Sequence, residues 1–150
     1  MAQLGPFPVE FGAVFPSGAY AAGGFDMVRD FEKSQGELVI QQADKATGLP
    51  LWVIEVIDAD PEARQRTVKV KVAATYQPVL PDAPAGSPFI PVEFEGMQAI
   101  PYVDSSRCQG NGDGKHKCRA RLAYSLKATG VRAPARLPSR PVPEHHKDAA

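Results

Sequence analysis

The sequence predicts a mainly β protein, folded as a small barrel of five to six strands. Short runs of β-branched and aromatic residues recur at hairpin spacing, separated by residues that favour turns. The 15 prolines are unfavourable for long helices. A chain of 150 residues is long enough for one domain with its own apolar core. A β-sandwich is the alternative architecture.

The sequence pattern is least regular in the N-terminal third of the chain, where only short elements are predicted. Residues 1–24 mix short apolar pieces with Gly and Pro and are expected to form an irregular arm, with a short strand at 9–15. Extended runs follow at 25–31 and 37–42, and a turn at 43–48. The barrel domain is therefore expected to span residues 25–132.

The clearest strands lie in the middle of the chain. Residues 51–57 are apolar on both faces, which indicates a central strand. Residues 67–75 alternate, so Val68, Val70 and Val72 are expected to face inward and Lys69 and Lys71 outward. Prolines mark a loop at 77–88. Short strands are predicted at 89–94 and 98–103, and the Pro-rich tail 133–150 is expected to be disordered.

A last strand is predicted at 115–127, where four cations occupy every second position. The alternating residues between and beyond them are apolar, so this strand is expected to have a cationic outer face and an inner face that places Tyr124 in the core. The cations of this row are Lys115, Lys117, Arg119 and Arg121.

Charge is distributed unevenly along the chain, although the formal net charge is zero. Residues 1–104 contain 7 Lys and Arg against 14 Asp and Glu, and residues 105–150 contain 10 against 3. A basic half indicates an anionic partner. The alternative is that the two halves pair with each other in the folded monomer.

A nucleic-acid-binding surface is the favoured interpretation, with an ordinary solvated sheet face as the alternative. If strands 67–75 and 115–127 share a sheet, their cations merge into a groove that suits a phosphate backbone. Among small barrels, the oligonucleotide-binding (OB) fold binds nucleic acid through one face and its loops, so the barrel is expected to be OB-like. Exposed aromatic residues would stack on bases. The predicted binding residues are Arg64, Arg66, Lys69, Lys71, Tyr76, Arg107, Lys115, Lys117, Arg119 and Arg121, and weaker stacking candidates are Trp52, Tyr102 and Phe89.

Signals of catalysis, metal binding and membrane insertion are weak or missing in the sequence. It contains no GxSxG sequence, Gly-rich phosphate loop or zinc-hydrolase helix, so no enzyme, cofactor or metal is predicted. Asp58 and Asp60 are expected to cap a turn or a short helix rather than to hold a metal ion. Cys108 and Cys118 flank a Gly-rich loop, where two free thiols are favoured over a disulfide. With no long apolar run and no signal-like start, a cytoplasmic protein without membrane contact is expected.

Several segments together resemble a known family. They are 44–52 (DKATGLPLW), 58–64 (DADPEAR), 101–104 (PYVD) and 119–128 (RARLAYSLKA). These segments are similar to the actinomycete plasmid replication, integration and excision activators of integrative conjugative elements, over roughly residues 10–132. The loop between Cys108 and Cys118 is then an insertion in this chain.

The resemblance implies a role in switching a mobile element from integration to excision and replication, without assigning functional residues. The basic strand and the scarcity of helix favour single-stranded DNA binding. Two alternatives stay open: an adaptor that recruits replication or recombination enzymes through 78–91 or the tail, and an activator that binds duplex DNA. A homodimer through an edge strand is a further possibility that the sequence leaves open.

Overall fold

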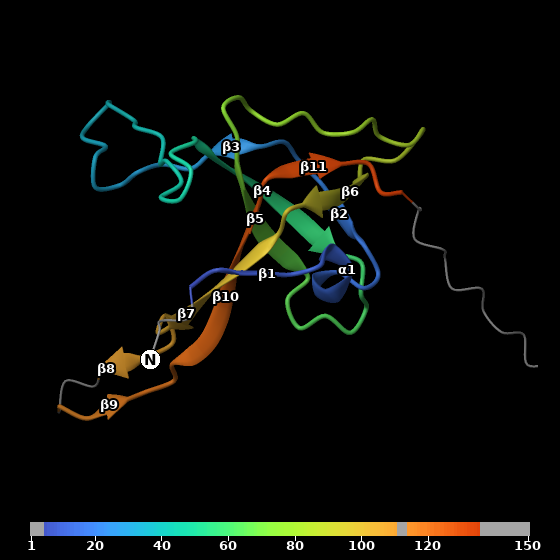
Figure 1. The fold of residues 1–150 in the computed structure, drawn as a ribbon. Helices are drawn as coiled ribbons and strands as arrows, with labels where there is room; N and C mark the ends of the chain where they lie inside the picture. The colour runs from blue at the N-terminus through green and yellow to red at the C-terminus, as the bar shows by residue number, and fades with distance from the viewer. Residues whose placement is uncertain (1–4, 111–113, 136–150) are drawn as a thin grey trace, which may run out of the picture.

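The computed structural model describes residues 5–110 and 114–135 and is mainly β (Figure 1). Its single described helix has four residues. Five of its strands have six or more residues, but the main sheet contains nine strands rather than the expected five to six, because four strands of two or three residues add to it. The elements are β1 (Phe7–Pro8), α1 (Phe11–Val14), β2 (Ala19–Ala21), β3 (Asp26–Met27), β4 (Leu51–Asp58), β5 (Thr67–Ala73), β6 (Ile90–Glu95), β7 (Gln98–Asp104), β8 (Gln109–Gly110), β9 (His116–Lys117), β10 (Arg121–Ala128) and β11 (Gly130–Arg132).

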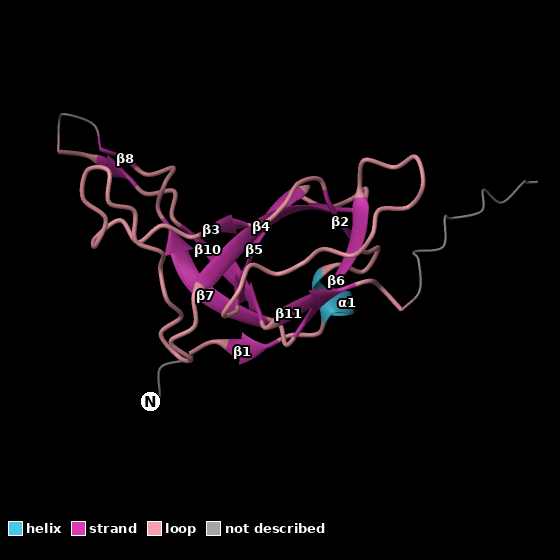
Figure 2. Cartoon of the chain, turned by 90° about the horizontal axis from the view of Figure 1, so that it is seen from above, coloured by secondary structure: helices cyan, strands magenta, loops and turns pink. Residues whose placement is uncertain are grey.

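The strands form one curled, open sheet with the order β1-β7-β10-β5-β4-β2-β6-β11, and β3 pairs with β4. Viewed from above, the sheet curves around the core as a half-barrel (Figure 2). Among the described strands, the two outermost, β1 and β11, do not pair with each other, so this barrel is not closed. A separate hairpin of β8 and β9 projects from the sheet (Figure 1).

The hairpin β4–β5 forms the centre of the sheet, as its sequence predicts. Ile54 lies opposite Val70 and Val56 opposite Val68, and Val70 and Val72 are fully buried. Lys69 is exposed on the other face. The alternation in residues 67–73 therefore separates the core from a charged face, as expected for a strand.

Strand β10 joins β5 in parallel and β7 in antiparallel orientation. Leu126 and Ala128 face the core beside Val70 and Val72, which they oppose in the ladder. A parallel neighbour requires a long crossover, and here β6 and β7 lie in the intervening chain. This pairing brings the C-terminal third of the protein against its central hairpin.

Part of the expected N-terminal arm instead belongs to the sheet. Strand β2 lies between β4 and β6, and Ala19 and Ala21 are almost completely buried. Phe15, 1% exposed, fills the core next to them. This strand is hard to predict because alanine is depleted in strands, whereas here two alanines lie between β4 and β6 in the buried centre of the sheet.

Three predicted extended runs are shorter or different in the structure. The run at 9–15 contains helix α1, in which Phe15 N–H donates to the carbonyl of Phe11 at 2.8 Å. The run at 25–31 keeps only β3, and 37–42 forms isolated bridges within a long excursion before β4. These runs contain the β-branched and aromatic residues that favour strands, but too few neighbouring segments of the chain pair with them to form long strands. Of the tail expected to be disordered, residues 133–135 have no regular structure and 136–150 lie outside the described residues.

Gly96 permits the tight turn between β6 and β7. Its φ of 58° is a left-handed conformation that glycine adopts without a steric penalty. A Cβ at this position would lie 2.5 Å from Oγ1 of Thr129. Thr129 N–H in turn donates to the carbonyl of Glu95 at 2.9 Å, so the turn packs directly on the β10–β11 connection.

A buried ion pair fixes the excursion before β4 to the sheet. Nζ of Lys127 lies 2.8 Å from Oδ1 of Asp44, and the two side chains are only 15% and 7% exposed. Asp44 also accepts hydrogen bonds from the backbone N–H and the hydroxyl of Thr47. Burial disfavours the carboxylate, but hydrogen bonds from Lys127 and Thr47 outweigh it and hold the pKa of Asp44 below its ordinary value.

Replacing Lys127 should therefore cost substantial stability. In Lys127→Ala the Asp44 carboxylate stays buried without its counter-ion, and we expect a loss of about 3 kcal/mol in the free energy of unfolding. Urea denaturation at neutral pH measures it. The matched control Lys45→Ala removes an exposed lysine from the same turn and should change stability by less than about 0.5 kcal/mol. Equal effects of the two variants would contradict a structural role for the ion pair.

Candidate nucleic-acid interface

The two predicted basic strands share one sheet, but they diverge along their length. The ladder between them runs only from Leu126 opposite Val70 to Ala128 opposite Val72. Toward residues 67–69 of β5 and 121–125 of β10 the described ladder ends, although β5 still pairs with β4 and β10 with β7. Figure 1 shows the two strands separating toward this end.

A groove of about 1200 Å³ lies where the strands separate. We call it the basic groove. One wall comes from β4, the β4–β5 loop and β5, the other from β7, the following turn and β10. Its lining residues are Glu55, Arg64, Gln65, Thr67, Val68, Lys69, Tyr102, Asp104, Ser106, Arg107, Arg121, Leu122, Ala123, Tyr124 and Ser125.

The structure brings five of the predicted site residues together in this groove. Four of them are cations on the two walls of the groove. The fifth, Tyr102, is 49% exposed and lies opposite Ala123 in the β7–β10 ladder. Two members of the same site were missed in the sequence: Asp104, whose pairing with Arg121 depends on a cross-strand register that spacing does not reveal, and Ser106, which hydrogen-bonds to Asp104 within the same turn. The five predicted residues are Arg64, Lys69, Tyr102, Arg107 and Arg121.

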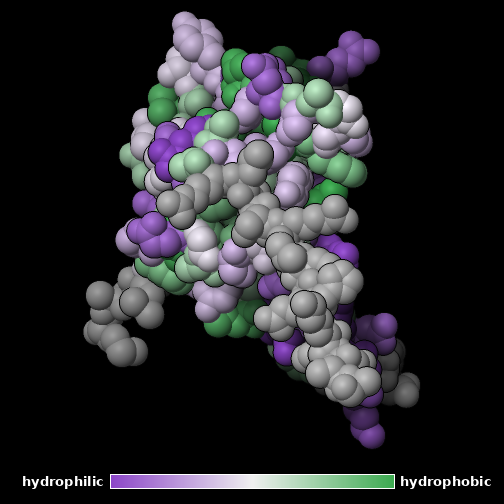
Figure 3. Space-filling model, turned by 90° about the vertical axis from the view of Figure 1, so that its right-hand side faces the viewer, coloured by the Kyte–Doolittle hydropathy of each residue, from purple (hydrophilic) through white to green (hydrophobic). Residues whose placement is uncertain are grey.

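The remaining predicted cations lie elsewhere. Arg66 donates to the carbonyl of Pro61 at 3.3 Å, within its own loop. Lys71 opposes Lys127 further along the β5–β10 ladder, outside the lining of the groove. Lys115 and Lys117 belong to the β8–β9 hairpin region, and Arg119 lies between this hairpin and β10. Figure 3 shows hydrophilic side chains at the lower end of the molecule, where Figure 1 places the hairpin.

The predicted single strand over 115–127 is wrong in two respects. Residues 118–120 interrupt it, so the row of four cations does not line one continuous face. Tyr124 is also not in the core: it is 53% exposed and meets the ring of Phe7 edge-on at 6.2 Å. The reason is that this end of β10 lies beyond the buried core, where the contact with Phe7 of β1 leaves the Tyr124 ring half exposed.

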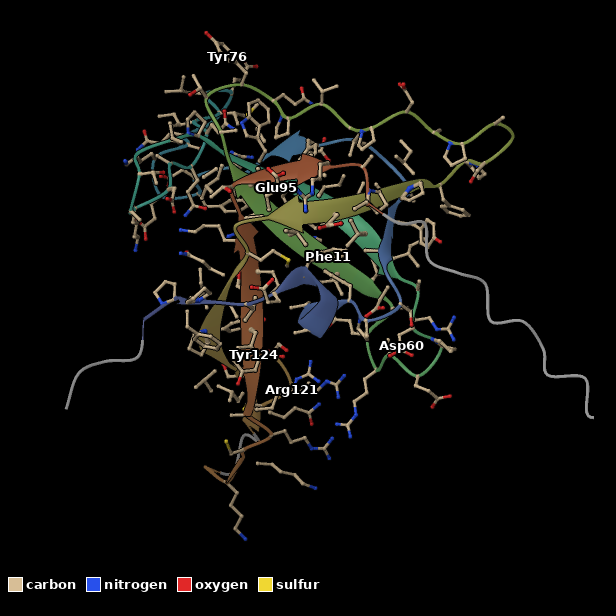
Figure 4. All side chains as sticks on the ribbon, turned by 45° about the vertical axis from the view of Figure 1, so that its right-hand side comes forward. Phe11, Asp60, Tyr76, Glu95, Arg121 and Tyr124 are labelled. Carbon is tan, nitrogen blue, oxygen red and sulfur yellow. The ribbon has the colours of Figure 1, made fainter. Side chains whose placement is uncertain are left out.

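Two of the stacking candidates are unsuitable for the groove. Trp52 is partly buried against the core, and its indole N–H donates to the carbonyl of Ala74 at 3.0 Å. Tyr76 is 83% exposed, but Figure 4 places it at the opposite end of the molecule from Arg121. Phe89, 43% exposed, precedes β6 and does not line the groove either. Tyr102 alone among these aromatic candidates lines the groove.

Two carboxylates moderate the positive charge of the groove. Oδ2 of Asp104 lies 3.1 Å from Nε of Arg121, and Glu55 opposes Lys69 in the β4–β5 ladder. Four cations and two carboxylates therefore line the groove, which leaves a positive balance. Beyond Glu55, a separate depression of about 510 Å³ is lined by Asp26 and by no Lys or Arg, so this face runs from acidic to basic.

Asp104 is held as a carboxylate to very low pH. Hydrogen bonds from Ser106, whose backbone N–H lies 3.0 Å from Oδ1, act together with the guanidinium of Arg121 to lower the pKa of Asp104 to about 2. An ionised Asp104 keeps the Arg121 guanidinium on the wall of the groove. The remaining guanidinium nitrogens are not used in this contact, which leaves Arg121 with donors to offer an anion.

The acidic pair at the end of β4 caps a turn, as expected. Asp60 N–H donates to Oδ1 of Asp58 at 2.9 Å, and Glu62 N–H donates to Oδ1 of Asp60 at 3.0 Å. Across residues 5–110 and 114–135, no cluster of three or more His, Cys, Asp or Glu side chains is arranged to bind a metal ion. No helix in the same residues is long and apolar enough to cross a membrane.

Comparison with known proteins gave no relative: no family model, no curated protein and no solved structure matches the chain.

The titration of Asp104 tests the geometry of the groove. Because the folded state lowers its pKa, the associated stabilisation is present above the ordinary value of 3.8 and is lost as pH falls through about 2. NMR titration of the carboxyl carbon should give a midpoint near this lower value. In Arg121→Ala the midpoint should rise but stay below the ordinary value, since the Ser106 hydrogen bonds remain. The control Lys33→Ala should leave it unchanged, and a wild-type midpoint near 3.8 would contradict the contacts.

Proposed function

We propose that this protein binds single-stranded DNA in the basic groove and is not an enzyme. The observation that supports this most is the meeting of four cations with a half-exposed aromatic ring, Tyr102, in one groove of the sheet. Proteins that bind single strands combine these two features: cations follow the backbone and aromatic rings stack on the bases.

Several features favour a single strand over a duplex. Reading a duplex commonly requires a recognition helix, and the one described helix has four residues. Tyr102 has a face on which an unpaired base can stack, whereas bases in a duplex are already stacked on each other. The groove is also a concave surface between diverging strands rather than a broad convex one.

The finer parts of the proposal rest on the sequence. The curled sheet supports, at a coarse level, the OB-like barrel that the strand pattern predicts. The resemblance to replication, integration and excision activators leads us to propose that the bound DNA belongs to an integrative mobile element, during its replication, excision or transfer. In this role the protein would work in the cytoplasm beside replication or recombination proteins.

Removing cations from the groove tests the proposal. The triple variant Arg64→Ala, Lys69→Ala, Arg107→Ala should weaken binding of a labelled strand of about 30 nucleotides by tenfold or more, as fluorescence anisotropy measures it. Each phosphate contact on a single strand contributes about 0.7 to the slope of log affinity against log salt, so losing three should reduce the slope by about 2.

A second triple variant provides the control. Arg29→Ala, Lys33→Ala, Lys45→Ala makes the same change in net charge outside the groove and should bind as the wild type does. If both variants lose affinity equally, net charge rather than the groove attracts the DNA. If the wild type binds neither single-stranded nor duplex DNA at micromolar protein, the proposed function is wrong.

Tyr102 should contribute to binding through its ring. Tyr102→Leu should reduce single-strand affinity about five- to hundredfold, the range expected for loss of one stacked base, whereas Tyr102→Phe should retain most of it. The comparison variant Tyr76→Leu removes a more exposed tyrosine outside the groove and should have no effect. Anisotropy at constant salt separates the three. A loss in Tyr76→Leu that equals the loss in Tyr102→Leu would place the DNA elsewhere.

A second candidate function is a protein–protein adaptor, and one observation favours it. The apolar face of β7 and β10 beyond the core is exposed: Val103 opposes Leu122, and these side chains are 68% and 63% exposed. Phe7 and Tyr124 extend this surface. Leu122 and Tyr124 also line the groove, so the two surfaces adjoin, and binding of a protein to the apolar side chains would be distinguished from DNA binding by its insensitivity to salt.

A further inference from the structure

Two cysteines face each other at the base of the β8–β9 hairpin. In its ladder, Gln109 opposes Lys117 and Gly110 opposes His116. Continuing this antiparallel register by one position places Cys108 opposite Cys118. Because side chains alternate between the faces of a strand, both thiols lie on the same face of the hairpin.

The distance between the two sulfurs agrees with this register. Sγ of Cys108 lies 3.9 Å from Sγ of Cys118. Directly opposed residues of an antiparallel pair have Cα atoms about 4.5–5.5 Å apart, which falls inside the range of about 4.4–6.8 Å found across disulfides. Bond formation requires the sulfurs to approach by about 2 Å, which side-chain rotation provides without moving the backbone.

The pair is accessible and oriented. Cys118 is exposed and Cys108 partly exposed, so a small oxidant can reach them. The backbone N–H of Arg119 donates to Sγ of Cys108 at 3.4 Å, which holds this sulfur on the side of its partner. Both cysteines are free in the structure, so it shows the reduced form.

We propose that Cys108 and Cys118 form a reversible disulfide by exchange with a small-molecule disulfide. One cysteine thiolate attacks a sulfur of glutathione disulfide, and the S–S bond of that molecule breaks to release one glutathione. The second cysteine then attacks the protein sulfur of the mixed disulfide and releases the other glutathione. Two protein thiols lose two electrons, the oxidant gains them, and their protons pass to the two glutathione thiols.

The bond would close the base of the hairpin that carries Lys115 and Lys117. It would also fix one wall of the basic groove, since Arg107 directly precedes Cys108. The inference depends on the geometry of the two thiols alone, so it stands whether or not the groove binds DNA.

Equilibration with reduced and oxidised glutathione, followed by thiol trapping and mass spectrometry, tests the proposal on the full chain. We expect the wild type to form the intramolecular disulfide without retained glutathione, and Cys118→Ser to stop at the mixed disulfide. A matched control moves the thiol by one residue: Cys118→Ser combined with Lys117→Cys places it opposite Gln109, on the other face of the hairpin. This double variant should form at least about tenfold less intramolecular disulfide at the same glutathione ratio.

The oxidised wild type should also show a more rigid hairpin. Hydrogen exchange of the amides in β8 and β9 should slow about tenfold on oxidation, because the bond prevents the hairpin base from opening. The proposal is overturned if the wild type retains glutathione on both cysteines, if it links to a second chain, or if the shifted variant closes as readily as the wild type.

Discussion

The parallel pairing of β5 with β10 is the constraint on which the rest of this structure depends. It involves three residues of each strand, yet it joins the β4–β5 hairpin to the antiparallel pair of β7 and β10 in a single sheet. This pairing lies in the core, since its apolar residues are all buried: Val70, Val72, Leu126 and Ala128. Because the pairing is short, the two strands are free to diverge at their other ends. The same contact therefore creates both the core and the groove.

The pairing also brings like charges together, and the fold compensates for this. Lys127 opposes Lys71 in the ladder, an arrangement that destabilises a sheet when nothing neutralises it. Asp44 neutralises Lys127 from a loop more than 80 residues earlier in the chain.

The uneven distribution of charge along the sequence is explained in part by similar pairing between distant segments. Four ion pairs join acids of the first 104 residues to cations of the last part, and they are made by Arg121, Lys127 and, with two acids, Arg132. Pairing between the halves thus accounts for part of the asymmetry, and Arg107, Lys115, Lys117 and Arg119 have no ion pair within the described residues.

Local patterns predicted the elements well where one strand buries a full face. The strand predicted at 51–57 was correct because a run that is apolar on both faces suits a central strand, and the strand at 67–75 because β-branched residues alternate with lysines. The pattern failed where the partner determines the outcome. Ala19 and Ala21 have weak strand propensity, yet β4 and β6 enclose them. Tyr124 has the spacing of a core residue, yet it lies at the end of β10 that extends beyond the buried core. In the groove, the cations were visible in the sequence, but the register that places Asp104 beside Arg121 was not.

The groove and the hairpin differ in how firmly their cations are held, and this difference bears on function. Arg121 is fixed by Asp104, and Lys69 belongs to a strand paired along its length, so these cations are positioned before any ligand arrives. Preorganised cations bind with a smaller loss of conformational entropy. The cations of the β8–β9 region, in contrast, belong to a hairpin that pairs with itself and not with the main sheet. A two-stranded hairpin without a covered face is marginally stable on its own. If the groove binds a single strand, as we propose, these cations are suited to following that strand beyond the groove, and a bond between Cys108 and Cys118 would position this second set as firmly as the first.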